Sequence, residues 1–170
     1  MPGFLLDLDG TLYHGDRPIP HAAEFIRWSR DRRFPFLFVT NNSSRTPGQV
    51  AEHLLRTGIE ASAEEVLSSA QAAAMHLKSD RPDGGSVYCI GEEGLRLALE
   101  EAGFTLAAEA GDQGIAAVVQ GIDRSFHYDK FAEGRAIHPS RCPVRADEPG
   151  SSAAVERRAD ARRRHYCRRH

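Results

Sequence analysis

Short apolar runs that end in polar residues recur along the first half of the chain. Residues 4–8 read Phe-Leu-Leu-Asp-Leu, and residues 36–39 read Phe-Leu-Phe-Val. Runs of this length predict buried strands of a parallel sheet. Apolar positions at helical spacing over residues 21–32 predict a helix between them. Together the three elements predict a βαβ unit whose two strand ends lie side by side.

Helix-start signals follow the second run. Thr46, followed by a proline, predicts the N-cap of a helix that stops at Gly58. Ser62 begins a Ser-Ala-Glu-Glu stretch of the capping-box form, which predicts a helix extending to about Lys78.

The same alternation of elements starts again after a turn-rich stretch at residues 80–85. Strands are expected at residues 87–90 and 115–119, with a helix over residues 92–102 between them. Strands that alternate with helices predict an α/β fold built on a parallel sheet.

Two carboxylates stand at the end of the first run. Asp7 and Asp9 are two residues apart, so a strand presents them on one face at its carboxyl end, where open α/β sheets bind ligands. Gly10 permits a tight turn, and Thr11 adds a hydroxyl. Burying two like charges is costly unless a cation or a reacting group compensates them. The alternative is a surface Asp-x-Asp-Gly turn, but the apolar strand before it favours a functional site.

A second polar cluster follows the second run. Thr40, Asn41 and Asn42 supply hydroxyl and amide groups that orient an anion without adding a competing acid. Taken alone, this stretch is typical of a turn; beside the first strand end it favours phosphate binding. Arg45 either reaches the phosphate or caps the loop, and the sequence leaves the two equal.

These two clusters carry a family resemblance. Asp7-Leu8-Asp9-Gly10-Thr11 resembles the first motif of the haloacid-dehalogenase-like (HAD) phosphohydrolases. Thr40-Asn41-Asn42 resembles the second motif, in the extended form of NagD-like and p-nitrophenylphosphatase-like members. The resemblance implies a Rossmann-like core and Mg²⁺-dependent hydrolysis of a small-molecule phosphate ester, of the sugar phosphate or nucleotide class.

The resemblance also implies roles for single residues. Asp7 would be the nucleophile that forms an aspartyl-phosphate, and Asp9 would be the general acid/base. Mg²⁺ would be held by Asp7, by the backbone carbonyl of Asp9 and by a more distant acidic motif. The phosphate-binding set would be Gly10, Thr11, Thr40, Asn41, Asn42 and Arg45.

The resemblance covers residues 3–133 and predicts the domain organisation. Residues 1–79 would form the N-terminal part of the core, and residues 80–133 would begin an α/β cap that closes over the site. Asp123 and Arg124 would be either substrate contacts or parts of a structural turn. His14 would lie in a flap beside the site, as a loop residue rather than a metal ligand.

Family members continue with a core lysine and a Gly-Asp-x-x-x-x-Asp stretch, which residues 134–170 do not contain. We therefore expect weak or no turnover from the chain as written. The alternative is a non-catalytic fragment, or a phosphate-binding remnant of an interrupted gene.

Charge separates the last segment from the rest. The chain has a net charge of −2, yet residues 134–170 hold ten arginines and four acidic residues, against 12 basic and 20 acidic residues before them. Such a basic tail is either disordered or, less favoured, a nucleic-acid binder.

A third interpretation of the tail is a frameshift. Moving the reading frame by one nucleotide permits Thr-Asn-Pro-Asp over residues 147–151 and Met-Pro-Gly-Ala-Gly-Ile-Ile over residues 160–167. Both resemble cap segments of NagD-like enzymes. Sequencing the codons for residues 131–145 tests this hypothesis, which an intact single frame would exclude.

Composition excludes several classes of protein. Three widely spaced cysteines give neither a disulfide framework nor a zinc pattern. No apolar run approaches bilayer length, and the N-terminus lacks the form of a signal peptide. We expect a cytoplasmic protein with no membrane partner, in which an open sheet edge allows a homo-oligomer.

Overall fold

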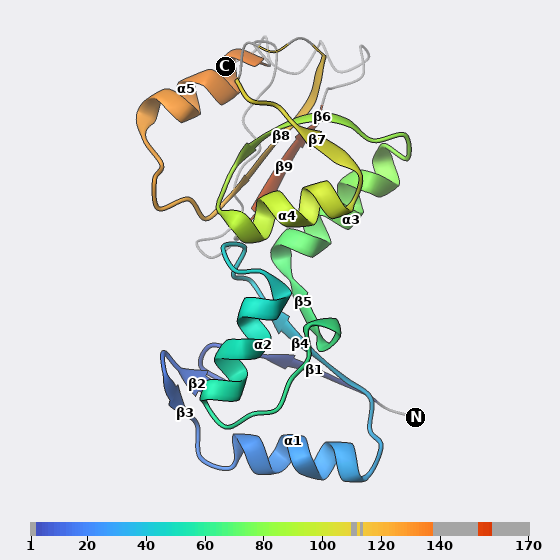
Figure 1. Cartoon of the computed structure of the whole chain (residues 1–170), viewed down its shortest axis with the longest axis vertical. Coiled ribbons are helices and arrows are strands. Elements are labelled where there is room, and N and C mark those ends of the chain that lie inside the picture. The colour runs from blue at the N-terminus through green and yellow to red at the C-terminus, as the bar shows by residue number, and fades with distance from the viewer. Residues whose placement is uncertain (1–2, 110–111, 113, 138–152, 158–170) are drawn as a thin grey trace, which may run out of the picture.

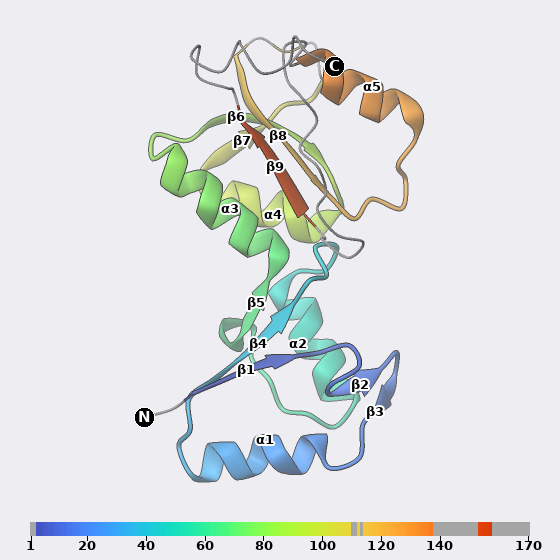
Figure 2. The same ribbon diagram turned by 180° about the vertical axis from the view of Figure 1, so that it is seen from behind.

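The computed structural model describes residues 3–109, 112, 114–137 and 153–157. These residues form two lobes that lie one above the other along the molecule (Figure 1; Figure 2 shows the opposite side). The first lobe contains β1 (Phe4–Asp7), β2 (Tyr13–His14), β3 (Arg17–Pro18), α1 (Ala22–Asp31), β4 (Phe36–Thr40), α2 (Pro47–Arg56), the 3₁₀ helix η1 (Ala63–Glu65) and β5 (Val66–Ser68). The second lobe contains α3 (Ser69–Asp80), β6 (Gly85–Ile90), α4 (Glu93–Glu101), β7 (Phe104–Leu106), β8 (Ile115–Gly121), α5 (Tyr128–Ile137) and β9 (Ala153–Arg157).

The first lobe is built on a three-stranded parallel sheet in the order β1-β4-β5. Asp7, the last residue of β1, is paired with Val39 of β4, so Thr40 lies one position further along the neighbouring strand. The expected βαβ unit and its adjacent strand ends are confirmed, because β1, α1 and β4 follow each other in this arrangement.

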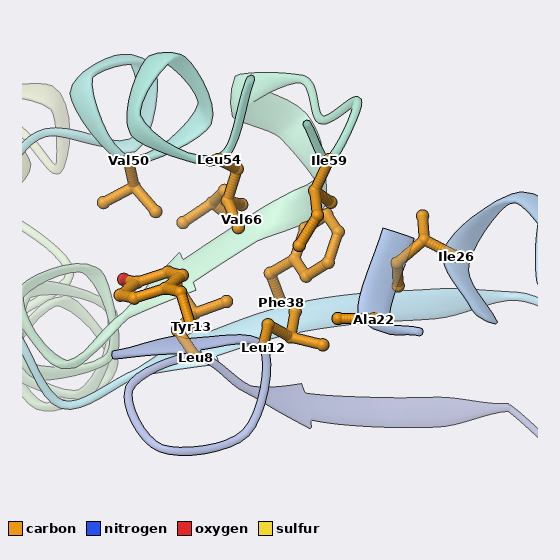
Figure 3. Packing of buried hydrophobic residues seen from close by; sticks show 10 residues of the cluster. All are labelled: Leu8, Leu12, Tyr13, Ala22, Ile26, Phe38, Val50, Leu54, Ile59 and Val66. Atoms are coloured by element: carbon orange, nitrogen blue, oxygen red, sulfur yellow. The ribbon is translucent and has the colours of Figure 1, made fainter. Parts of the chain in front are cut away.

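One face of this sheet carries the core of the first lobe. Side chains of α1, α2 and the strands meet there in a single buried cluster (Figure 3): Leu8, Leu12, Tyr13, Ala22, Ile26, Phe38, Val50, Leu54, Ile59 and Val66. Strand side chains alternate between the two faces, so Leu5, Leu37, Val39 and Leu67 point to the other side. The side chain of Leu5 is 77% exposed, which shows that this second face is open at β1.

The helix after β4 begins as the sequence predicts. Thr46 is the N-cap of α2, and its hydroxyl accepts a hydrogen bond from the backbone N–H of Gln49. The Gln49 side chain accepts in return from the N–H of Thr46, which completes a capping box. Gly58 follows the helix with a φ of 85°, the left-handed conformation expected of a residue that ends a helix.

The single helix predicted from Ser62 to about Lys78 is wrong. The capping-box sequence opens only the short helix η1, and residues Val66–Ser68 then form β5 along β4. The helix α3 has its own N-cap, Ser68, whose hydroxyl accepts from the backbone N–H of Gln71. Pairing with β4 stabilises the extended conformation of residues 66–68 more than a continuous helix would, because it buries Val66 in the core of the first lobe.

The second lobe has a sheet in the order β7-β6-β8-β9, in which β9 alone is antiparallel to its neighbour β8. The helices α3 and α4 cover one face through a buried cluster: Ala70, Ala74, Leu77, Val87, Leu95, Ala98, Leu99, Phe104, Ala117 and Val119. The helix α5 contacts the other face, where the Tyr88 hydroxyl donates a 2.8 Å hydrogen bond to Glu133. The α/β class expected from the sequence is confirmed.

The packing of α3 bears on the expected division between residues 79 and 80. Its buried side chains belong to the core of the second lobe, although its sequence precedes the turn at residues 80–85. The division therefore stays a prediction.

Most of the basic tail lies outside the described residues. Of residues 134–170, the structure describes the end of α5 and the strand β9. The expectations of disorder, nucleic-acid binding and a frameshift rest on this segment and stay predictions. Within the described part of the chain, no helix is long and apolar enough to cross a membrane.

Candidate phosphate and metal site

A tight loop follows β1 and determines where the two carboxylates lie. The N–H of Leu12 donates to the carbonyl of Leu8 at 2.9 Å, and the N–H of Gly10 donates to the carbonyl of Tyr13 at 2.8 Å. Gly10 has a φ of 84°, which favours glycine at this turn. The loop therefore holds Asp9 immediately beyond the strand end, next to Asp7.

Both carboxylates are exposed, while Leu8 between them is fully buried. Because water reaches both groups, the cost of burying two like charges does not arise in this structure. Two exposed carboxylates at one strand end remain available to a cation or to an anionic group held by one.

Tyr13 fixes the loop after β1 to the core of the first lobe. Its ring is buried in the core of the first lobe and packs edge-on against His53 of α2, with ring centroids 4.7 Å apart (Figure 3 shows Tyr13 within the core). His53 is buried as well, and its Nε2 lies 3.0 Å from the carbonyl oxygen of Gly15, so it ties the turn between β2 and β3 to α2.

The pKa of Tyr13 reports which charges surround it. Burial, the largest cause, and the negative charges of Asp9 and Asp7 together raise the pKa to about 12, against the opposing positive charge of Arg45. Three residues predicted for the site thus lie close enough to act on one phenol. Arg45 itself is exposed, and whether it contacts phosphate or caps the loop stays open.

The second predicted cluster forms the loop after β4. Thr40 is buried, and its hydroxyl oxygen accepts the backbone N–H of Asn42 at 3.1 Å. The hydroxyl proton of Thr40 therefore remains available to donate to an anion. Asn41 is exposed, and its carbonyl accepts from the hydroxyl of Ser69 at 2.9 Å.

Asn42 has a role within this loop. Its side-chain oxygen accepts two hydrogen bonds of 2.8 Å from Ser44, one from the backbone N–H and one from the hydroxyl. The turn that the sequence allowed as the alternative to a phosphate site is thus present. Its hydrogen bonds use the side-chain oxygen of Asn42, so the side-chain N–H₂ group remains to donate to a phosphate.

Asp7 and Asp9 are the oxygen donors that fit a magnesium ion. Mg²⁺ binds through one or two carboxylates and keeps several waters or phosphate oxygens as its other ligands. No group of three or more histidine, cysteine or acidic side chains with metal-binding geometry occurs among the described residues.

Asp123 and Arg124, which lie in the predicted cap, have structural partners. Asp123 accepts hydrogen bonds from Lys130 at 2.9 Å and from Ser125 at 2.6 Å. Burial raises the pKa of Asp123, but these hydrogen bonds outweigh it and hold the pKa below its usual value. Arg124 pairs with Glu92 at 2.6 Å. These contacts favour the structural turn over substrate binding.

Two residues near the site have no signal in the sequence. His53 lies within an ordinary amphipathic helix, and Ser43 lies in a run of polar residues where nothing distinguishes it from its neighbours. Their partners, Gly15 and Ile122, are 38 and 79 residues away along the chain, so only the folded structure reveals them. His14 is exposed, but the prediction that it lies in a loop is wrong: its backbone pairs with Arg17 of β3, so it belongs to the short strand β2.

Comparison with known proteins gives consistent matches. A family model described as haloacid dehalogenase-like hydrolase matches residues 4–105. The 5'-nucleotidase YutF of Bacillus subtilis (strain 168) is 52% identical over 132 residues, which are 78% of this chain and 50% of that protein. The acid sugar phosphatase of Staphylococcus haemolyticus is 42% identical over 130 residues, which are 76% of this chain and 48% of that protein.

A solved structure agrees with these sequence matches. The glycerol phosphate phosphatase Rv1692 of Mycobacterium tuberculosis, solved in complex with magnesium, superposes with a TM-score of 0.71 at 35% identity. The match covers 79% of this chain and 40% of that one. The chain spans about half the length of the curated relatives it matches.

Proposed function

This chain belongs to the haloacid dehalogenase-like hydrolases, and on that premise we propose that it carries the nucleophile half of a phosphatase site for small-molecule phosphomonoesters. The observation that supports this most is the position of Asp7 and Asp9 at the carboxyl end of β1, beside the end of β4 that carries Thr40. The resemblance to NagD-like phosphatases is borne out by a solved NagD structure from E. coli among its structural neighbours.

The proposed reaction has two steps. The Asp7 carboxylate attacks phosphorus and forms an acyl phosphate, while the ester O–P bond breaks and protonated Asp9 gives its proton to the leaving alcohol oxygen. Asp9, now ionised, then takes a proton from a water molecule that attacks the same phosphorus. This second attack releases inorganic phosphate and restores the Asp7 carboxylate.

The neighbouring groups hold the phosphoryl oxygens. The Thr40 hydroxyl donates to one oxygen, and the Asn41 side chain, exposed at the strand end, offers an amide N–H₂ group. Mg²⁺ held by Asp7 and the backbone carbonyl of Asp9 would neutralise charge on the transferring group. Gly10 and Thr11 shape the loop on which these groups sit.

The substrate class follows from the relatives by analogy. A 5'-nucleotidase and an acid sugar phosphatase both act on small phosphate esters, which supports a nucleotide or a sugar phosphate as substrate. A cytoplasmic location and assembly into a homo-oligomer remain predictions from the sequence. The competing proposal is a remnant that binds phosphate without transferring it.

A phosphoryl-trapping experiment separates the enzyme from the remnant. We would incubate the chain with Mg²⁺ and acetyl phosphate, digest it, and locate any added phosphoryl group by mass spectrometry. The expected result is a modified peptide containing Asp7 that is absent from Asp7→Asn and reduced in Thr40→Val. Asp31→Asn, which removes an exposed carboxylate at the end of α1, is the matched control and should behave as the wild type.

Three outcomes are distinguishable. Phosphate binding that needs Asp7, without a phosphorylated peptide, would favour the remnant. Modification that survives in Asp7→Asn would contradict the proposed nucleophile. Absence of both binding and modification would contradict a phosphate site in this chain.

A further inference from the structure

The loop after β4 touches both lobes, and its contacts with the second lobe go beyond what phosphate binding requires. We propose that Ser43 and Gly94 are positioning residues through which the second lobe holds the phosphate-binding loop in place. This inference rests on the proposed function for its consequence, while its structural part stands on contacts that can be tested separately.

Ser43 makes the first contact between the lobes. Its side chain is fully buried, and its hydroxyl oxygen accepts the backbone N–H of Ile122 at 2.9 Å. Ile122 comes immediately after β8, so the bond ties the end of a second-lobe strand to the loop of the first lobe. Loss of the hydroxyl would leave a half-buried backbone donor without this acceptor, which is a costly change.

Gly94 makes the second contact. Its backbone N–H, in the first turn of α4, donates to the carbonyl of Ser44 at 3.0 Å. A Cβ on Gly94 would overlap the carbonyl oxygen of Arg45 and would lie 2.8 Å from that of Ser43. The loop backbone therefore approaches α4 as closely as only glycine allows, and any side chain here must push the two apart.

Hydrogen bonds within the second lobe connect the segments that make these two contacts, the start of α4 and the end of β8. The N–H of Glu92 donates to the carbonyl of Ile122 at 3.1 Å, and the Glu92 carboxylate pairs with Arg124 at 2.6 Å. Arg124 also lies 3.4 Å from the hydroxyl of Ser44. The start of α4 and the end of β8 are thus bonded to each other in one corner of the second lobe, against which the loop is packed.

Three hydrogen bonds in series connect this corner to Thr40. Gly94 donates to the Ser44 carbonyl, the Ser44 N–H donates to the side chain of Asn42, and the Asn42 N–H donates to the Thr40 hydroxyl. The geometry of the proposed phosphate ligands therefore depends on the docking of the second lobe. By thermodynamic linkage, phosphate bound at Thr40 stabilises that docking by the same amount.

The test compares two glycines that occupy equivalent places. Gly94 and Gly48 both lie in the first turn of a helix, but a Cβ on Gly48 would meet only the Thr46 hydroxyl at 3.9 Å, an ordinary contact. We would measure amide hydrogen exchange at Asn42 and Ser44 by NMR in the wild type, Gly94→Ala, Ser43→Ala and Gly48→Ala. Circular dichroism would verify that each variant is folded.

The expected result is faster exchange at Asn42 and Ser44 by about fivefold or more in Gly94→Ala and Ser43→Ala, the change that loss of one hydrogen bond produces. Gly48→Ala should exchange as the wild type does. Ser43→Ala introduces no steric overlap, so it keeps the test informative if Gly94→Ala does not fold. Unchanged exchange at both amides in Ser43→Ala would overturn the proposal.

A titration with inorganic phosphate and Mg²⁺ then tests the functional consequence. Both interface variants should bind phosphate about fivefold more weakly than the wild type and Gly48→Ala. Wild-type affinity in variants whose loop amides exchange faster would overturn the coupling. Absence of phosphate binding in the wild type would instead contradict the proposed function, and the exchange data would still decide the positioning role.

Discussion

Tyr13 is the residue at which the charges of the site can be followed individually. The negative charges of Asp9 and Asp7 raise the pKa of its buried phenol, and the positive charge of Arg45 lowers it. The ring also fills the core of the first lobe and packs on His53. A single side chain thus links the packing of the fold to the electrostatics of the carboxylate pair.

We predict that the Tyr13 phenol makes the free energy of unfolding fall as the pH rises above about 10. Its folded-state pKa of about 12 lies above the ordinary value of 10.0, so the fold favours the neutral phenol. This contribution is fully present below about pH 10 and is lost as the pH rises toward about 12. The free energy of unfolding, measured by urea between about pH 8 and about pH 12, should fall less steeply in Tyr13→Phe than in the wild type.

Two further variants control this measurement. Tyr88→Phe should also flatten the profile, because burial and the hydrogen bond to Glu133 raise the pKa of Tyr88 to about 12. Tyr128→Phe removes a hydroxyl from a side chain that is exposed on α5 and should leave the profile as it is. Identical profiles for Tyr13→Phe and the wild type would contradict the prediction.

Among the elements, α3 shows that a capping sequence alone does not determine where a helix begins, because tertiary contacts also act on its start. Ser62 and Ser68 are each followed, three residues later, by a side chain that completes a capping box. Only Ser68 is the N-cap of a long helix. Ser62 is exposed and opens η1, whereas Ser68 is buried at the end of β5. The sheet decides where the helix starts, because β5 must first pair with β4.

We therefore predict unequal effects of removing the two hydroxyls. Ser68→Ala should lower the free energy of unfolding by about 1 kcal/mol, since α3 loses its cap and the Gln71 N–H loses an acceptor. Ser62→Ala should cost only a few tenths of a kcal/mol, because it affects a single turn at the surface. Chemical denaturation of both variants would show this difference, and equal losses would contradict it.

On the scale of the whole molecule, the first lobe has a parallel sheet whose helices, α1 and α2, share one face. Parallel sheets are normally covered on both faces. The opposite face carries the apolar side chains of Leu5, Leu37, Val39 and Leu67, of which Leu5 is the most exposed. An open apolar face of this kind favours association.

We predict that this face makes the chain associate as its concentration rises. Leu5→Lys should shift light-scattering masses toward the monomer, because a charge would have to be desolvated in the contact. Leu55→Lys is the matched control, since Leu55 is 60% exposed on α2 away from the open face and should leave the masses unchanged. Equal masses for Leu5→Lys and the wild type at every concentration would contradict the prediction.

Local chemistry explains how much the sequence determined by itself. Strand-length apolar runs, the Thr46 cap and the Gly58 stop act over a few residues, so the βαβ unit and α2 follow from the pattern alone. The positions of Asp7, Asp9 and Thr40 also follow from local pattern, because alternation and parallel pairing bring adjacent strand ends together.

Contacts between distant parts of the chain decided the rest. The strand β5 forms inside a predicted helix because β4 lies beside it, and Asp7 and Asp9 stay exposed at the end of β1. The partners of Ser43, His53 and Gly94 lie dozens of residues away in sequence, and no local pattern encodes them. The sequence thus determined which side chains stand at the strand ends, and the tertiary structure decided what packs around them, since burial and close backbone approach exist only once both lobes have packed.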